Sequence, residues 1–171
     1  MHKGHIFDLL TRPSAETYGV LMRSVIAHPD FRIRSNAMKE LWKRFEAGDL
    51  AAVREGLAAI SLLWIHSPDY HILMHALAKR DGDAQSADIE ARFAYCCFQG
   101  MLATGDGSYD RPYQVARVED EYVLLQHLKI SWTRQSMIER DQRVTDIFER
   151  SDGTALHFEL PKADLLTGKA L

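Results

Sequence analysis

The residues with the clearest potential for metal chemistry are two histidines and two neighbouring cysteines in the middle of the chain. His71 and His75 stand four positions apart, so on a helix they share one face and can bind the same metal ion. Cys96 and Cys97 lie in the next expected helix, and Cys97 could complete a site of two histidines and one cysteine. The chain lacks the Cys-x-x-Cys spacing of dedicated metal sites, however, and such side chains more often pack as ordinary residues. We therefore expect no bound metal and no cofactor.

A second set of residues could act as general acids and bases or bind a hard cation. These are the carboxylates of Asp106, Asp110, Glu119, Asp120, Glu121 and Asp146. A structural interpretation is simpler, because Asp106 sits in a glycine-rich turn, acids 119–121 suit the first turn of a helix, and Asp146 falls in an expected strand. The sequence also contains no phosphate-binding loop with its lysine, no Gly-x-Ser-x-Gly and no His-Glu-x-x-His. We assign no catalytic residue from the sequence.

Partner binding is the third possibility. Helix pairs that stack on one another leave a concave groove, and aromatic or histidine side chains that the core does not use can line it. The candidates for this face are His71, His75, Tyr95 and Gln99. The segment 32–54 carries six basic and three acidic residues, so it could steer an acidic partner to the helical end. Its candidate residues are Arg32, Arg34 and Lys43, although a charged run of this kind is usually a solvated face.

The elements that would position these residues begin with helices. Apolar residues recur at helical spacing over 15–27, 38–45, 53–64, 70–77 and 89–101. Gly48-Asp49 and Gly82-Asp83 lie between successive helices, and glycine suits the end of one helix while aspartate suits the start of the next. The two dipeptides are 34 residues apart, which is the period of a tetratricopeptide helix pair. We expect about five antiparallel, tetratricopeptide-like helices, with a generic helical bundle as the alternative.

The pattern changes after Thr104, where residues 105–108 form a Gly-Asp-Gly-Ser turn cluster. Alternating residues predict a strand over 111–118, and the acids at 119–121 lie in the first turn of a short helix whose apolar residues extend to 128. Further strands are expected over 135–139, 144–148 and 155–160, with Asp152-Gly153 as the hairpin turn between the last two. The predicted fold is therefore α+β and mainly α. It has a helical region over 1–104, a small β-α-β-β-β module over 105–160 docked on it, and a flexible tail over 161–171.

The same module resembles part of a known group of proteins. The run 105–108, the segment 112–125 with its Asp120-Glu121-Tyr122, and the segments 135–138 and 152–160 resemble the C-terminal module of a bacterial family of unknown function. In that family, tetratricopeptide-like helices precede a Gly-Asp-Gly to Asp-Glu-Tyr segment and a small sheet. The resemblance covers roughly 67–160, and Glu159 stands where the family pattern favours aspartate. It implies an architecture and a bacterial cytoplasmic origin, and it transfers no catalytic residue.

Composition limits the remaining function classes. The chain has 171 residues, 46% of them hydrophobic, and a net charge of −3, which gives no general reason to bind nucleic acid or an anionic membrane. Adjacent cysteines on a helix do not easily form a disulfide, and a charged N-terminus argues against a signal peptide, so we expect a cytoplasmic protein. The favoured function is a non-enzymatic adaptor that binds a peptide or partner protein in a helical groove, with a homodimer possible. The alternative is a metal-dependent enzyme or accessory factor that uses the His71/His75 face or the acids near Asp106 and Asp120.

Overall fold

The computed structural model describes residues 2–140 and 143–161, and over this part of the chain it contains seven helices and a four-stranded sheet. The helices are α1 (His2–Thr11), α2 (Ala15–Ile26), α3 (Ala37–Glu46), α4 (Leu50–Trp64), α5 (Pro68–Asp81), α6 (Ala84–Ala103) and α7 (Val118–His127). The strands are β1 (Tyr113–Gln114), β2 (Arg134–Arg140), β3 (Arg143–Glu149) and β4 (Ala155–Leu160). The predicted class, α+β and mainly α, is confirmed. Of the tail predicted over 161–171, residues 162–171 lie outside the described residues.

Two helix connections have the geometry that their Gly-Asp dipeptides predict. Gly48 and Gly82 adopt φ values of 80° and 74°, a left-handed conformation that glycine reaches without a steric penalty. The aspartates that follow then act as N-caps: Asp49 accepts a hydrogen bond from the backbone NH of Ala52, and Asp83 accepts one from Ser86. These turns reverse the chain between α3 and α4 and between α5 and α6. The closer kinship to tetratricopeptide repeats stays a prediction.

The first helix was not expected from the sequence. The helical region was predicted to hold about five helices, and α1 is an additional one at the N-terminus. Its apolar residues do not form a clean stripe, because Leu9 is buried whereas Phe7 is exposed. In the sequence, Met1 stands before it, and methionine is not a capping residue type, unlike the Ser14 that caps α2. Hydrophobic periodicity and capping are the main helix signals in a sequence, and α1 has little of either.

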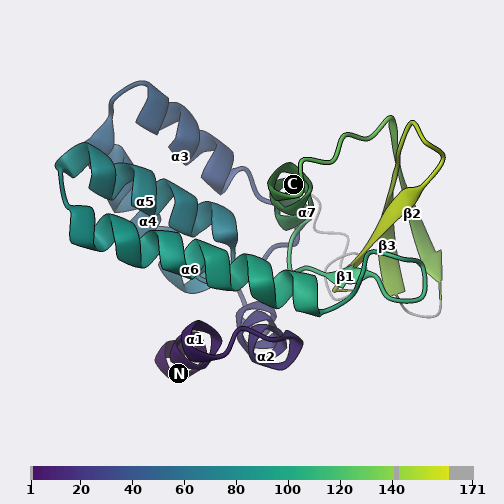
Figure 1. Ribbon diagram of the computed structural model, residues 1–171. Helices are drawn as coiled ribbons and strands as arrows, with labels where there is room; N and C mark the ends of the chain where they lie inside the picture. Colours follow the sequence, from purple (N-terminus) through teal and green to yellow (C-terminus); the bar gives the residue numbers. More distant parts are fainter. Residues whose placement is uncertain (1, 141–142, 162–171) are drawn as a thin grey trace.

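The long helices α5 and α6 run side by side and form the centre of the helical region (Figure 1). The pair α1 and α2 packs on one side of α6, and α3 and α4 pack beside α5. The sheet lies at the other end of the molecule, and α7 stands between it and the helices (Figure 1). Among the described residues, no helix combines the length and apolar character that a transmembrane span requires.

The sheet has the strand order β1-β4-β3-β2, and the predicted β-α-β-β-β sequence of elements is confirmed. Strand β1 pairs parallel to β4, whereas β4 with β3 and β3 with β2 are antiparallel. The predicted turn at Asp152-Gly153 joins β3 to β4, with Gly153 at a φ of 81°. The first strand is shorter than the predicted 111–118, because the chain leaves β4 after Val115 and begins α7 at Val118.

The buried apolar residues form two separate cores. The larger one contains residues of α1, α2, α6, α7 and the sheet, from Leu9 at the N-terminal side to Leu160 in β4. The smaller one lies between α3, α4 and α5 and includes Leu57, Trp64 and Leu73. The sheet module thus shares its core with the N-terminal helices and with α6, while α3–α5 pack around a core of their own.

Candidate partner-binding site

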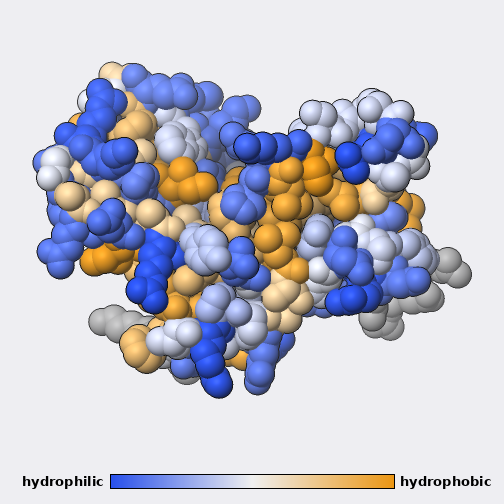
Figure 2. Space-filling view, in the orientation of Figure 1, coloured by the Kyte–Doolittle hydropathy of each residue, from blue (hydrophilic) through white to orange (hydrophobic). Residues whose placement is uncertain are grey.

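A shallow apolar groove of about 270 Å³ lies where α5, α6 and α7 meet. It is lined by Ile72 and His75 of α5, by Ala91, Ala94, Tyr95 and Phe98 of α6, and by His127 of α7. Figure 2 shows hydrophobic side chains gathered near the centre of this face of the molecule, where α6 passes α7. The small side chains of Ala91 and Ala94 leave the depression, and the larger residues form its edges.

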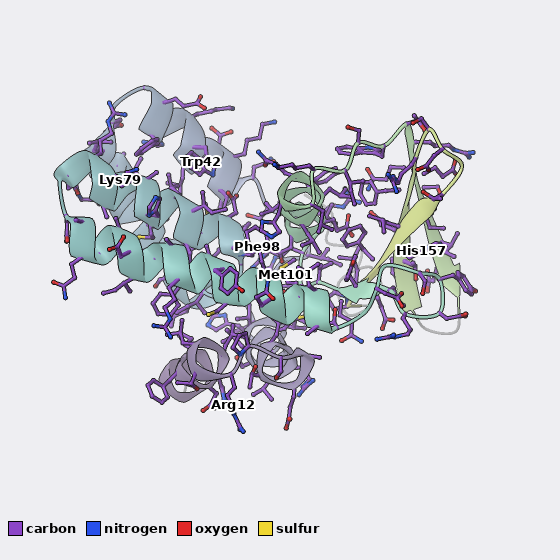
Figure 3. All side chains as sticks on the ribbon, viewed as in Figure 1. Arg12, Trp42, Lys79, Phe98, Met101 and His157 are labelled. Atoms are coloured by element: carbon purple, nitrogen blue, oxygen red, sulfur yellow. The ribbon has the colours of Figure 1, made fainter. Side chains whose placement is uncertain are left out.

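The base and rim of this groove are aromatic. Phe98 lies on the part of α6 that faces α7 (Figure 3), and the His127 ring stacks on it with centroids 3.8 Å apart and planes inclined by 11°. Tyr95, one helical turn earlier, is 58% exposed, so its ring stands at the edge of the groove rather than inside the core. Exposed aromatic side chains beside a depression are typical of protein-binding surfaces.

His75 provides the groove with a polar atom of defined character. Its Nδ1 lies 2.8 Å from the carbonyl oxygen of Ala87. A carbonyl oxygen can only accept a hydrogen bond, so Nδ1 carries the ring proton and donates this hydrogen bond. In the neutral ring, Nε2 is therefore an acceptor, and it forms no hydrogen bond with the described residues. The groove thus offers an apolar surface with one hydrogen-bond acceptor at its edge.

The structure brings together only part of the face predicted from the sequence. His75 and Tyr95 line the groove, whereas His71 and Gln99 do not. His71 is buried, with Nδ1 2.7 Å from Glu90 Oε2 and Nε2 3.0 Å from the carbonyl oxygen of Ile65. Its ring also stacks on Phe93, so His71 joins α5 to α6 instead of facing a partner.

Several groove residues were missed by sequence reasoning. Phe98 stands three positions after Tyr95, a spacing that places both on neighbouring parts of one helix face, so it could have been found. Ala91 and Ala94 give no signal of their own, because small residues are common in any helix. His127 belongs to α7, and only the packing of α7 beside α5 and α6 brings it to Phe98.

The predicted basic residues lie elsewhere. Arg32, Arg34 and Lys43 are all exposed, and none of them lines the groove. Arg32 donates to the carbonyl oxygens of Pro29 and Phe31 at 3.0 Å and 2.6 Å, and Lys43 pairs with Glu40 at 2.8 Å. Such exposed pairs contribute little free energy, which suits the solvated face considered above.

The metal site considered from the sequence finds no support in the described residues. Within them, no group of three histidine, cysteine or acidic side chains is placed to hold a metal ion. Both ring nitrogens of His71 already face oxygen acceptors. Cys97 is buried, and burial followed by the charge of Asp120 raises the pKa of its thiol, which disfavours the thiolate that a metal requires.

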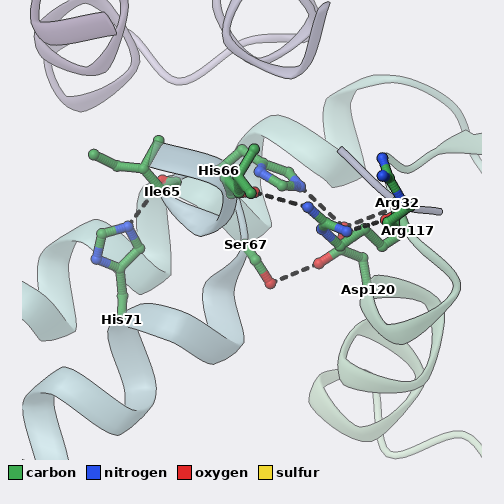
Figure 4. Close-up of polar contacts among 8 residues, drawn as sticks. Arg32, Ile65, His66, Ser67, His71, Arg117 and Asp120 are labelled. Carbon is green, nitrogen blue, oxygen red and sulfur yellow. Dashed lines mark hydrogen bonds and ion pairs between the residues drawn. The ribbon is translucent and has the colours of Figure 1, made fainter. Parts of the chain in front are cut away.

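A buried polar junction lies beneath the N-terminus of α7 (Figure 4). The Arg117 guanidinium is sandwiched between the rings of Phe31 and Trp64, with centroid distances of 4.4 Å and 4.5 Å. It donates to the carbonyl oxygens of Arg32 and Leu63. Arg117 therefore connects the loop before α3, the end of α4 and the start of α7.

Asp120 completes this junction. It accepts hydrogen bonds from the Ser67 hydroxyl at 2.6 Å and from the backbone NH of Arg117 at 3.2 Å, and His66 Nε2 lies 3.3 Å away. Burial alone would raise the pKa of Asp120, but the charge and hydrogen bond of His66 and the hydrogen bond of Ser67 outweigh it, so the pKa is lowered. Ser67 bonds to Asp120 rather than to His66, and all three are fully buried, so this is no serine-hydrolase triad.

Glu121 and Asp146 form a second buried acidic cluster, between α7 and β3. Burial, and then the charge of Asp146, raises the pKa of Glu121 to about 10. Apart from their hydrogen bond to each other, neither carboxyl oxygen of Glu121 nor Asp146 Oδ1 has a hydrogen-bond partner. Two carboxyl groups in contact are stable when one of them holds a proton. Both residues are among the candidate acids predicted from the sequence, but their contact was not predicted.

Two of the other predicted acids, Asp106 and Glu119, have structural roles. Asp106 is exposed, accepts from the backbone NH of Ser108 at 3.0 Å and pairs with Arg111 at 3.4 Å, as its turn sequence predicted. Glu119 accepts from the backbone NH of Ser35 at 2.8 Å. Asp106 and Asp120 therefore have separate partners and do not share one site.

Comparisons with protein-family models, with curated proteins and with solved structures give no match for this chain. The resemblance to a bacterial family therefore stays a prediction.

Proposed function

We propose that this protein is a non-enzymatic adaptor that binds a peptide segment of a partner protein in the groove between α5, α6 and α7. The observation that carries the proposal is the accessible apolar depression with Tyr95 on its rim, since water-exposed apolar surface of this kind is stabilised by a partner. The volume of the groove suits one or two apolar side chains rather than a whole small-molecule substrate.

The chemistry of the lining defines the expected peptide. An aromatic or aliphatic side chain would contact Phe98, His127 and the small residues of α6. An NH donor on that side chain, as in tryptophan, would suit the free Nε2 of His75. The partner is thus a peptide with an apolar anchor, and tryptophan is the anchor that uses every feature of the groove.

The test is a selection of random peptides displayed on phage against the full chain, followed by affinity measurement. We expect selected peptides to carry a tryptophan or another large apolar residue, and their binding to weaken by about tenfold or more in Tyr95→Ala. The variant Ala91→Trp fills the groove from an exposed position and should abolish binding. Tyr109→Ala is the matched control, because Tyr109 is similarly exposed but lies outside the groove.

Either of two results would overturn this proposal: no peptide is selected, or the selected peptides bind Ala91→Trp as tightly as the wild type. Methyl NMR spectra provide the location, since binding in the groove must shift the signals of Ile72, Ala91 and Ala94.

The alternative of a metal-dependent enzyme or accessory factor has weaker support in the described residues. His71 is occupied by Glu90 and Ile65, and Asp106 and Asp120 have separate partners. Elemental analysis of the purified protein tests it directly. A stoichiometric transition metal that is lost in His71→Ala would favour the alternative over the adaptor.

A further inference from the structure

Two consecutive acids of α7, Asp120 and Glu121, are both fully buried, and each has an arginine nearby, Arg117 for Asp120 and Arg34 for Glu121. Asp120 lies beside Arg117, whose guanidinium is held between the rings of Phe31 and Trp64. Glu121 faces the opposite side, toward β3, where it meets Asp146. Apart from the hydrogen bond between these two carboxyl groups, neither oxygen of Glu121 has a hydrogen-bond partner, and Asp146 Oδ1 has none either.

The surroundings of Glu121 contain the same kind of aromatic rings. Tyr122, Trp132 and Phe148 contact one another with centroids 5.5–5.7 Å apart. Tyr122 is 38% exposed and Trp132 is 41% exposed, whereas Phe148 is buried. The rings therefore extend from the core to the surface beside the acidic pair, and their faces attract cations.

A polar connection leads from this surface to the acids. The Tyr122 hydroxyl donates to Gln135 Oε1 at 2.6 Å, and Gln135 Nε2 donates to Asp146 Oδ2 at 2.8 Å. Gln135 itself is exposed on β2, so its side chain can rotate away without disturbing the core. Its amide NH2 donates to Asp146, and a stronger donor could replace it there.

We propose that Glu121 and Asp146, with the rings of Tyr122 and Trp132, form a docking site for an arginine side chain of a partner polypeptide. A guanidinium can donate two parallel hydrogen bonds to carboxylates while its plane stacks on aromatic rings. It would replace Gln135 as the donor to Asp146, and it would donate to Glu121 in place of the proton that the two acids share. At the Arg117 junction a guanidinium likewise lies between two aromatic rings, where it donates to backbone carbonyl oxygens.

The position of β2 favours a polypeptide as the source of the arginine. β2 is the edge strand of the sheet, so its outer backbone groups face away from β3. Met137, which lies opposite Asp146 in the β2–β3 register, is 52% exposed next to this edge. An extended segment can lie along such an edge and direct one side chain over the sheet. This surface is distinct from the groove of the proposed function.

Binding should release a proton. The charged or titratable groups near Glu121 are Asp146 of β3, Arg34 from the loop before α3, and Asp120 and Tyr122 of α7. In the free protein the acidic pair shares one proton, and a bound guanidinium favours the fully ionised pair, so that proton leaves to solvent. Affinity should therefore increase with pH between 6 and 8, by up to about tenfold per unit.

The test uses the full chain and the blocked peptide Ac-Ala-Arg-Ala-NH2 as the probe. We expect a saturable shift of the Trp132 indole NH signal in NMR spectra, stronger at pH 8 than at pH 6. The peptide with citrulline in place of arginine has nearly the same shape without the charge, and it should cause no saturable shift. The double variant Glu121→Gln/Asp146→Asn should lose binding while its fold, followed by circular dichroism, is kept.

Each remaining arm separates one competing explanation. Equal shifts with citrulline, or unchanged binding in the double variant, would overturn the proposal. Free L-arginine that binds as tightly as the peptide would overturn the polypeptide source, and a response to Ca²⁺ or Mg²⁺ alone would show a metal site instead. If the probe binds only to the Arg34→Gln variant, Arg34 of the same chain occupies the site in the wild type. That result would overturn the docking of a partner arginine. If Glu121 and Asp146 only gain and lose a proton and bind no arginine, the Trp132 signal will change with pH but not when the peptide is added. That result would also overturn the proposal.

Discussion

Glu121 is a residue whose ionisation the fold opposes. It is buried beside Asp146, and burial together with the charge of Asp146 raises its pKa from 4.5 to about 10. Between these values the folded protein keeps a proton that the unfolded chain has lost, so unfolding releases it. The contribution of Glu121 to stability is therefore fully present at low pH and decreases as pH rises, by at most about 1.4 kcal/mol per unit.

The variant Glu121→Gln tests this directly. Glutamine has a similar shape, cannot ionise, and can donate an NH to Asp146 in place of the shared proton. We expect it to be more stable than the wild type at pH 8–9, by about 1 kcal/mol or more, with a flatter dependence of stability on pH. Urea denaturation at several pH values between 6 and 9 measures both quantities.

Glu40→Gln is the control for this experiment, because Glu40 is fully exposed and pairs with Lys43. The hydrogen bond and charge of Lys43 lower the pKa of Glu40. The contribution of Glu40 to stability therefore has the opposite pH dependence: it is present above about pH 5 and is lost as pH falls further. Parallel stability curves for the wild type and Glu121→Gln above pH 6 would contradict the shared proton.

At the scale of the elements, the connection from α6 to β1 depends on a close backbone approach at Gly105. A Cβ added to this glycine would lie 2.3 Å from the carbonyl oxygens of Arg111 and Pro112. Both atoms belong to the backbone, so no side-chain rotation can relieve the clash. We expect Gly105→Ala to destabilise the protein by about 2 kcal/mol or more, measured by urea denaturation.

Gly153 offers a matched comparison in the β3–β4 turn. It has a φ of 81° but no heavy atom within 4 Å of an added Cβ, so only the backbone conformation opposes alanine. Gly153→Ala should therefore cost about 1–2 kcal/mol. If Gly105→Ala lowers the free energy of unfolding less than Gly153→Ala does, the close approach of residue 105 to residues 111–112 does not limit the side chain at position 105.

Elements with local signals were the ones that the sequence could predict. The turns at Gly48-Asp49, Gly82-Asp83 and Asp152-Gly153 depend on one dipeptide each, and all three have the expected conformation. The end of β1 depends instead on where α7 packs, and α1 depends on contacts with α2 and α6. Neither element could be read from residues near it in the sequence.

The same distinction explains the candidate site. His75 and Tyr95 were found because a helix pair predicts which side chains face outward. The stacking of His127 on Phe98 joins positions on α6 and α7, and the contact of Glu121 with Asp146 joins α7 to β3. Such pairs are created by tertiary packing, so residue type alone identified the candidate acids but not their pairing.

At the scale of the whole molecule, one arginine connects the two hydrophobic cores. Phe31 belongs to the larger core and Trp64 to the smaller one, and the Arg117 guanidinium lies between their rings. Arg117 also donates to carbonyl oxygens of the segments that lead into each core, at Arg32 and Leu63. The helices α3–α5 are therefore not an independent unit, and both cores should unfold together.

Arg117→Met tests this coupling. Methionine keeps part of the apolar contact with the rings but leaves two carbonyl oxygens and Asp120 without the guanidinium, a loss of about 3–5 kcal/mol. Hydrogen exchange measured by NMR should show reduced protection by a similar amount in α4 and in β4, one element from each core. Arg117→Lys, which keeps the charge, provides a milder variant if methionine prevents folding, and Arg111→Met is the exposed control. Protection that falls in α4 alone, with β4 unchanged, would mean that the cores are stable independently and that Arg117 only supports the smaller one.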